Sequence, residues 1–161
     1  MYPVQLINKI KEKLVEDQHT IAVAESVTSG HLQAAFSLAD EATFFYQGGI
    51  TAYNLGQKSR HLFIEPIHAI KNNCVSADIA CDMALNVARV FLSHYGIGIT
   101  GYAAPIPEEG IDQLFAFYAI SFKGEIVHQA KITANNMSML DAQLYYTDQV
   151  LQGMFAMLQA N

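Results

Sequence analysis

The chain has 161 residues, of which 52% are hydrophobic and 15% charged, and this length is typical of one domain with a buried core. Fifteen acidic residues against nine basic ones give a formal net charge of −6, which argues against binding to the phosphates of nucleic acid. No apolar run reaches the roughly 18 residues that a transmembrane helix needs, and the N-terminal segment lacks the features of a signal peptide. We therefore expect a single cytoplasmic domain over residues 1–161 that binds neither nucleic acid nor a membrane.

The first half of the chain is predicted to alternate between helices and short strands. Apolar residues at a spacing near 3.6 predict an amphipathic helix over 3–16, and the apolar run at 20–24 predicts a buried strand. A second helical pattern covers 27–39. A strand is predicted over 48–53, and a short helix is predicted to follow over 55–62.

The middle of the chain is predicted to contain a long helix, a strand of small residues and a surface loop. Ser76 is a favourable N-cap for a helix over 77–93. Residues 96–100, Gly-Ile-Gly-Ile-Thr, predict a third strand with few large side chains. Prolines and acidic residues within 101–113 predict a surface loop, and ligand sites are frequent in such loops.

Two further strands and a helix complete the predicted domain. Residues 114–122 are apolar on both faces, and the turn at Lys123 and Gly124 predicts antiparallel pairing with a strand over 125–132. A last helix is predicted over 138–158. This order of elements predicts the α/β class, a three-layer α/β/α sandwich with a mixed sheet.

The pattern of metal-binding residue types predicts no metal site and no cofactor. The six histidines are scattered, and Cys74 and Cys81 do not form a CxxC pair. In the absence of a secretory signal, both cysteines are expected to be reduced thiols.

The segment 24–30, Ala-Glu-Ser-Val-Thr-Ser-Gly, joins the first predicted strand to a helix and carries three hydroxyl side chains. Free N–H groups at the start of a helix favour an anion or a developing oxyanion. Ser26 on this turn is therefore a candidate nucleophile or anion ligand. The same residue types are common helix caps, and the loop by itself fits both interpretations.

Polar residues also follow the second and third predicted strands. They are Tyr53, Asn54 and Lys58 after the second strand, and Thr100 and Gly101 after the third. Parallel strands end at the same edge of a sheet, so we expect these residues to lie near Ser26. A lysine in a partly desolvated site can lose its proton and act as a base toward a serine, although a lysine on a short helix is as often solvated.

Four segments together resemble the C-terminal domain of the competence- and damage-inducible protein CinA, a family that includes stand-alone nicotinamide-nucleotide amidases. The family pattern is Ala-Glu-Ser-Cys-Thr-Gly-Gly, then Phe-x-Gly-Gly-x-x-x-Tyr-x-Asn-x-x-Lys, Val-Ser and Thr-Gly-x-Ala-Gly-Pro. The corresponding segments are 24–30, 46–58, 75–76 and 100–105. The resemblance implies a three-layer fold around a mostly parallel five-stranded sheet, assembled as a homodimer or a higher homo-oligomer.

The resemblance also implies an activity, hydrolysis of the carboxamide of nicotinamide mononucleotide to the acid and ammonia. Ser26 would be the nucleophile, Lys58 the base that takes its proton, and Tyr53 the residue that orients the pair. Backbone N–H groups of residues 28–30 would hold the oxyanion. The residues expected to contact substrate are Glu25, Thr28, Ser29, Gly30, Asn54, Thr100 and Gly101. We further hypothesise that Glu25 holds Lys58 in place.

Several positions depart from the family pattern and motivate an alternative function. Val27 replaces a cysteine, Ser29 replaces a glycine, residues 103–107 replace a glycine-rich loop, and residues 134–136 lack the family's arginine, a side chain suited to bidentate phosphate binding. The alternative is a catalytically degenerate domain that binds a nucleotide or serves homo-oligomeric assembly. Apolar side chains of the last helix fit either an interface or the core, and they are Tyr145, Tyr146, Met154, Phe155 and Met157.

Overall fold

The computed structural model describes residues 1–71 and 73–160, in which five strands form one mixed sheet in the order β2-β1-β3-β4-β5. The strands are β1 Ile21–Glu25, β2 Tyr46–Thr51, β3 Tyr95–Tyr102, β4 Leu114–Phe122 and β5 Glu125–Ala134. β1 pairs in parallel with both β2 and β3, whereas β4 is antiparallel to both β3 and β5. Four strands therefore run in one direction and only β4 opposes them, which confirms the mixed, mostly parallel sheet.

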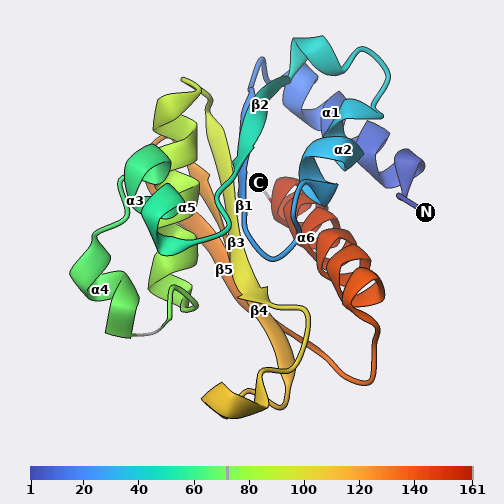
Figure 1. Cartoon of the computed structure of the whole chain (residues 1–161). Coiled ribbons are helices and arrows are strands. Elements are labelled where there is room, and N and C mark those ends of the chain that lie inside the picture. The colour runs from blue at the N-terminus through green and yellow to red at the C-terminus, as the bar shows by residue number, and fades with distance from the viewer. Residues whose placement is uncertain (72, 161) are drawn as a thin grey trace.

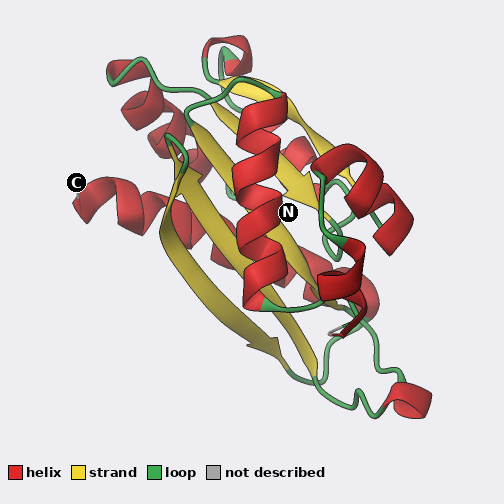
Figure 2. Cartoon of the chain, turned by 90° about the vertical axis from the view of Figure 1, so that its left-hand side faces the viewer, coloured by secondary structure: helices red, strands yellow, loops and turns green. Residues whose placement is uncertain are grey.

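Helices cover both faces of this sheet, as Figure 1 shows. One layer contains α1 Val4–Glu16, α2 His31–Ser37 and α6 Met139–Ala160, and the other contains α3 Leu55–Leu62, α4 Pro66–Lys71 and α5 Ala77–Val90. Figure 2, seen from the side of α5, shows this helix lying across the sheet, where it packs on β3 and β4. The three-layer α/β/α sandwich is thus confirmed. No described helix is long and apolar enough to span a membrane.

Strand β1 lies at the centre of two hydrophobic cores. Ile21 and Val23 pack in the core that includes α1, α2 and α6, whereas Ala22 and Ala24 face the core that includes α3 and α5. Side chains of a strand alternate between its two faces, so a continuous apolar run is required where both faces are covered. This double burial fixes the end of β1 in place.

The small residues of β3 let α5 approach the sheet closely. A Cβ atom on Gly96 would lie 2.0 Å from the carbonyl oxygen of Ala84, and one on Gly98 would lie 2.3 Å from that of Ala80. Contacts this short require glycine, because any side chain would push the helix away from the strand. In the Gly-Ile-Gly-Ile segment of β3, the glycines therefore face the backbone of α5. The isoleucines face the hydrophobic core on the other side of the sheet.

Some expected elements differ in the structure. The helix predicted over 27–39 begins only at His31, and Gly30, with a φ of 102°, precedes it. Helix α4 and two short 3₁₀ helices, η1 Ala42–Phe44 and η2 Pro107–Glu109, were not predicted. In these short segments the apolar periodicity is too brief to distinguish a helical turn from a loop.

The apolar side chains of α6 belong to the core. Tyr146 and Met154 are fully buried, and Tyr145, Phe155 and Met157 pack against the same cluster. Core packing is therefore shown for Tyr146 and Met154, whereas Tyr145, Phe155 and Met157 are only partly buried, and a role of these three in an interface stays a prediction.

Candidate functional site

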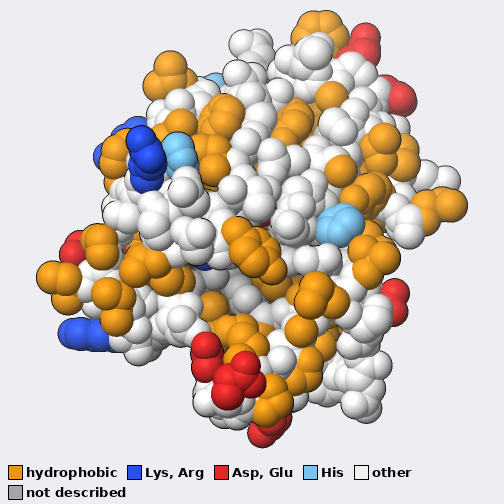
Figure 3. All heavy atoms as spheres, in the orientation of Figure 1, with side chains coloured by type: hydrophobic (Ala, Val, Ile, Leu, Met, Phe, Trp, Pro, Cys, Tyr) orange, Lys and Arg blue, Asp and Glu red, His pale blue; other side chains and the backbone are white. Residues whose placement is uncertain are grey.

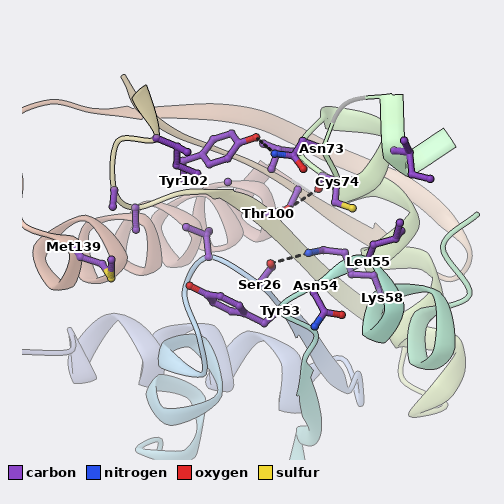
Figure 4. Close-up of a pocket in the computed structure, with 17 residues that line it drawn as sticks. Ser26, Tyr53, Asn54, Leu55, Lys58, Asn73, Cys74, Thr100, Tyr102 and Met139 are labelled. Carbon is purple, nitrogen blue, oxygen red and sulfur yellow. Dashed lines mark hydrogen bonds between the residues drawn. The ribbon is translucent and has the colours of Figure 1, made fainter. Parts of the chain in front are cut away.

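Three strands end at one edge of the sheet and line a cavity of about 520 Å³. Ser26 follows β1, Tyr53 and Asn54 follow β2, and Thr100 and Gly101 lie near the end of β3. Because β1 pairs in parallel with both neighbours, all three ends point the same way, as predicted. Figure 4 shows the side chains that surround the cavity. The volume of the cavity suits a small organic molecule.

The cavity contains a serine–lysine pair. The Nζ atom of Lys58 lies 2.8 Å from the Oγ atom of Ser26, and Figure 4 shows the two side chains meeting between β1 and α3. Lys58 is only 2% exposed and Ser26 is 7% exposed. The alternative of a solvated lysine is therefore wrong, and the serine is held at the wall of the cavity by a buried amine.

Helix α3 positions Lys58 through an ordinary cap. The side chain of Asn54 accepts a hydrogen bond from the N–H of Gln57 at 3.0 Å, and the N–H of Lys58 donates to the carbonyl of Asn54 at 2.9 Å. Asparagine is among the favoured N-cap residues because its side chain replaces a missing helical acceptor. The first turn of α3 thus directs the lysine toward the end of β1.

The electrostatic surroundings of Lys58 favour its neutral form. Within the described residues, no carboxylate lies within 4.0 Å of its Nζ atom. Burial lowers the pKa of Lys58 below its ordinary value, and the neighbouring Cys74 thiol opposes this effect in part. A neutral amine has a lone pair and can accept the proton of Ser26.

Glu25 does not hold Lys58, which corrects the hypothesis made from their proximity to Ser26. The Glu25 carboxylate is fully buried and accepts hydrogen bonds from the N–H groups of Gly30, Leu32 and Gln33 at 2.8–3.2 Å, together with the hydroxyl of Thr28 at 2.5 Å. A strand alternates its side chains, so Glu25 and Ser26 point to opposite sides. Glu25 therefore caps α2 and is not in the cavity lining.

The residues expected to supply oxyanion donors are largely engaged within the loop itself. The N–H of Ser29 donates to the carbonyl of Ser26 at 3.1 Å, the N–H of Gly30 donates to Glu25, and Thr28 is fully buried. Ser29, Gly30 and Thr28 are not in the cavity lining. Val27 lines the cavity, and its N–H has no acceptor among the described residues. The backbone N–H of Val27 therefore lies directly after Ser26, the candidate nucleophile.

The remaining predicted residues all line the cavity, but in different ways. Tyr53 is 65% exposed at the mouth and makes no hydrogen bond to Ser26 or Lys58 in the described structure, so the pair is oriented by α3 and by burial instead. The hydroxyl of Thr100 donates to the carbonyl of Cys74 at 2.8 Å, which ties β3 to the segment before α5. Gly101 has no room for a Cβ, which would lie 2.4 Å from the carbonyl oxygen of Phe115.

Sequence reasoning missed part of the lining, namely Asn73, Cys74 and Met139, whereas Tyr102 lies within the matched segment 100–105. Asn73 donates hydrogen bonds to Glu109 at 2.6 Å and to the hydroxyl of Tyr102 at 3.4 Å. Asn73 and Cys74 have positive φ angles, which turn the chain sharply between α4 and α5. The only available signal was their position just before the Val75-Ser76 segment of the family pattern.

Comparisons with known proteins agree on one family. The CinA C-terminal domain matches residues 4–154. A CinA-like protein of Thermosynechococcus vestitus is 35% identical over 100 residues, and one of Prochlorococcus marinus is 41% identical over 87 residues. These matches cover 62% and 53% of this chain but only 24% and 20% of the relatives. The chain thus corresponds to a fraction of the length of these larger proteins.

Solved structures agree on the fold. The competence-damaged protein (CinA) superfamily protein from Enterobacter cloacae superposes with a TM-score of 0.91 at 21% identity, over 98% of this chain and 93% of that one. The competence or damage-inducible protein from Enterobacter asburiae gives 0.91 at 23% identity, over 98% and 99%.

Proposed function

This chain belongs to the CinA C-terminal domain family, and we propose that it is a serine–lysine hydrolase that cleaves a small carboxamide to the acid and ammonia. The observation that carries this proposal is the 2.8 Å contact between Ser26 and a buried lysine that has no carboxylate partner among the described residues. A lysine kept only to stabilise the fold would be expected to have an acidic partner or to reach water, because burying an unpaired amine is unfavourable.

The proposed first half-reaction forms an ester on the serine. Neutral Lys58 takes the proton of the Ser26 hydroxyl as the Oγ atom attacks the amide carbon. The N–H of Val27 supports the oxyanion of the tetrahedral intermediate. Lys58 then returns its proton to the amide nitrogen, the carbon–nitrogen bond breaks, and ammonia leaves.

The second half-reaction restores the enzyme. Lys58 takes a proton from a water molecule, which attacks the ester carbonyl of Ser26. The ester bond breaks, the Ser26 oxygen recovers the proton and the carboxylate product leaves. The sum is one amide and one water converted to one carboxylate and one ammonium ion, and the family resemblance suggests a nicotinamide carboxamide as the group that is hydrolysed.

The nucleophile can be tested without knowing the substrate. An alkyl fluorophosphonate reacts with activated serine hydroxyls, so we expect one adduct on Ser26 by intact mass and peptide mapping. Ser26→Ala and Lys58→Ala should each lose the adduct, whereas Ser37→Ala and Lys13→Ala, which alter exposed residues of α2 and α1, should retain it. Absence of any adduct on Ser26 in the folded protein would contradict the hydrolase proposal.

Turnover is tested by ammonia release from a panel of small carboxamides that includes nicotinamide mononucleotide. Ser26→Ala and Lys58→Ala should each lower kcat by on the order of 10³-fold, because the pair acts as a unit. A ligand that stabilises the protein against heat, combined with no ammonia release and no adduct, would support the alternative of a degenerate binding domain instead.

A further inference from the structure

We propose that the amide hydrolysed in this cavity carries no phosphate, and that the rest of the molecule is neutral or cationic. This inference rests on the proposed hydrolase function and names its substrate class. It follows from the charges and the available N–H donors around the cavity.

Among the described residues that line the cavity, none is a cation free to bind a phosphate. Of the 17 residues that line it, Lys58 is the only lysine or arginine, and its amine is already hydrogen-bonded to Ser26. The other walls are largely apolar, with contributions from Val27, Leu55, Ile106 and Met139. A phosphate buried against such walls loses its water without gaining the charge-assisted hydrogen bonds that would compensate.

The start of α2 is occupied by the protein's own acceptors, and a side-chain cap takes one N–H each at α3 and α5. At α2, the Glu25 carboxylate takes the N–H groups that would otherwise face an anion. At α3 the side chain of Asn54 accepts from Gln57, and at α5 the hydroxyl of Ser76 accepts from the N–H of Ile79 at 3.2 Å. Helix N-termini bind phosphate through free N–H groups, and at α2 those groups already have partners within the protein.

The loop over the cavity supplies few donors. Pro105 and Pro107 have no N–H, and the N–H of Ile106 donates to the carbonyl of Ile111 at 2.8 Å. Within residues 103–107, only the backbone N–H groups of Ala103 and Ala104 remain available as donors to a ligand. A phosphate-binding loop needs several convergent N–H groups, which this sequence does not provide.

The rim of the cavity adds negative charge. Glu108 and Glu109 lie on η2, and Glu109 contacts the cavity through its hydrogen bond with Asn73. Figure 3 shows acidic side chains gathered beside the hollow, at the place where Figure 1 has η2. The adjoining depression has one charge of each sign, Lys71 and Glu109. A phosphate dianion would be repelled at the rim, whereas a neutral or cationic group would not.

A matched pair of substrates tests the inference directly. Nicotinamide riboside and nicotinamide mononucleotide share the amide, the cationic ring and the ribose, and they differ only in the phosphate. We expect the kcat/KM for ammonia release to be about tenfold or more higher for the riboside than for the nucleotide, because only binding of the nucleotide removes water from a phosphate. Nicotinamide and benzamide extend the panel to neutral amides.

Protection of Ser26 gives a second readout that does not need turnover. At least one phosphate-free amide should slow the fluorophosphonate adduct, and the nucleotide should protect less well. Better protection or faster hydrolysis with the nucleotide, or no protection by any phosphate-free amide, overturns the inference. Loss of the adduct altogether is a separate result, because it contradicts the hydrolase proposal itself.

Variants that change the charge at the rim test whether a cation there alters the preference between the two substrates. Ala104→Arg should raise kcat/KM for the nucleotide about tenfold relative to the riboside, and Ala104→Gln should not, because it adds bulk without charge. Lys71→Ala should leave the ratio between the two substrates unchanged. A fall in nucleotide preference in Lys71→Ala would show that this lysine already binds the phosphate, and the inference would be wrong.

Discussion

A lysine amine that is 2% exposed and hydrogen-bonded to a hydroxyl instead of a carboxylate destabilises the fold that contains it. The pKa of Lys58 is lowered by burial, so between that lowered pKa and the ordinary one the folded chain binds fewer protons than the unfolded chain. Stability therefore rises with pH across that window, and the penalty disappears above the ordinary pKa of lysine. Such a cost is typical of functional residues.

Replacing this amine by an apolar side chain should stabilise the protein. We expect Lys58→Met to raise the Tm at neutral pH by about 2–4 °C, on the order of 1 kcal/mol for a domain of this size, with a smaller difference at alkaline pH. Calorimetry at neutral and alkaline pH measures both effects. Lys58→Arg, which keeps a buried charge, is the control and should lower the Tm. A Met variant that is less stable at neutral pH would contradict this account.

At the scale of elements, the first turn of α2 depends on a side chain from the strand before it. The Glu25 carboxylate satisfies three N–H groups at the helix start, although α2 is only seven residues long. A helix this short has little stability of its own and depends on its cap and its packing. The same contact fixes the loop that carries Ser26.

Loss of this cap should therefore be costly. Glu25→Gln keeps the shape but removes the charge and one acceptor oxygen, and we expect a loss of about 1–3 kcal/mol in the free energy of unfolding, measured with urea. Glu125→Gln on the exposed start of β5 is the matched control and should change it by less than about 0.5 kcal/mol. Equal stability of the Glu25→Gln variant and the parent chain would show that the cap contributes little.

At the scale of the whole molecule, the two hydrophobic cores share one sheet. The alternating residues of β1 enter both cores, and α5 packs on the same β3 strand whose isoleucines face the other layer. Neither layer can lose its packing without exposing β1 and β3. The two layers are therefore expected to unfold together.

Tryptophan reporters can test this coupling, because the chain has no tryptophan of its own. Phe155→Trp reports on the layer of α6 and Phe91→Trp on the layer of α5, and both positions are half-buried. We expect the fluorescence transitions of both variants in urea to coincide with the loss of far-UV circular dichroism. Separate midpoints for fluorescence and circular dichroism within one variant would show independent layers.

The sequence by itself determined the layers and most of the site. The continuous apolar run of β1, the Gly-Ile alternation of β3 and the helical periodicity of α1 and α5 are local patterns, and the structure confirms the element that each one predicts. Because parallel strands end at one edge, the sequence also brought Ser26 and Lys58 to one site.

Only the tertiary structure decided what each polar side chain contacts. Glu25 is adjacent to Ser26 in sequence, yet it caps α2, because successive strand residues face opposite ways and three N–H groups required an acceptor. Lys58 is a buried amine because α3 directs its side chain toward Ser26, the residue that follows β1. The charges at the cavity, and hence the class of amide that we propose for it, depend on residues such as Asn73 and Glu109 that are 36 positions apart in sequence and meet only in the folded chain.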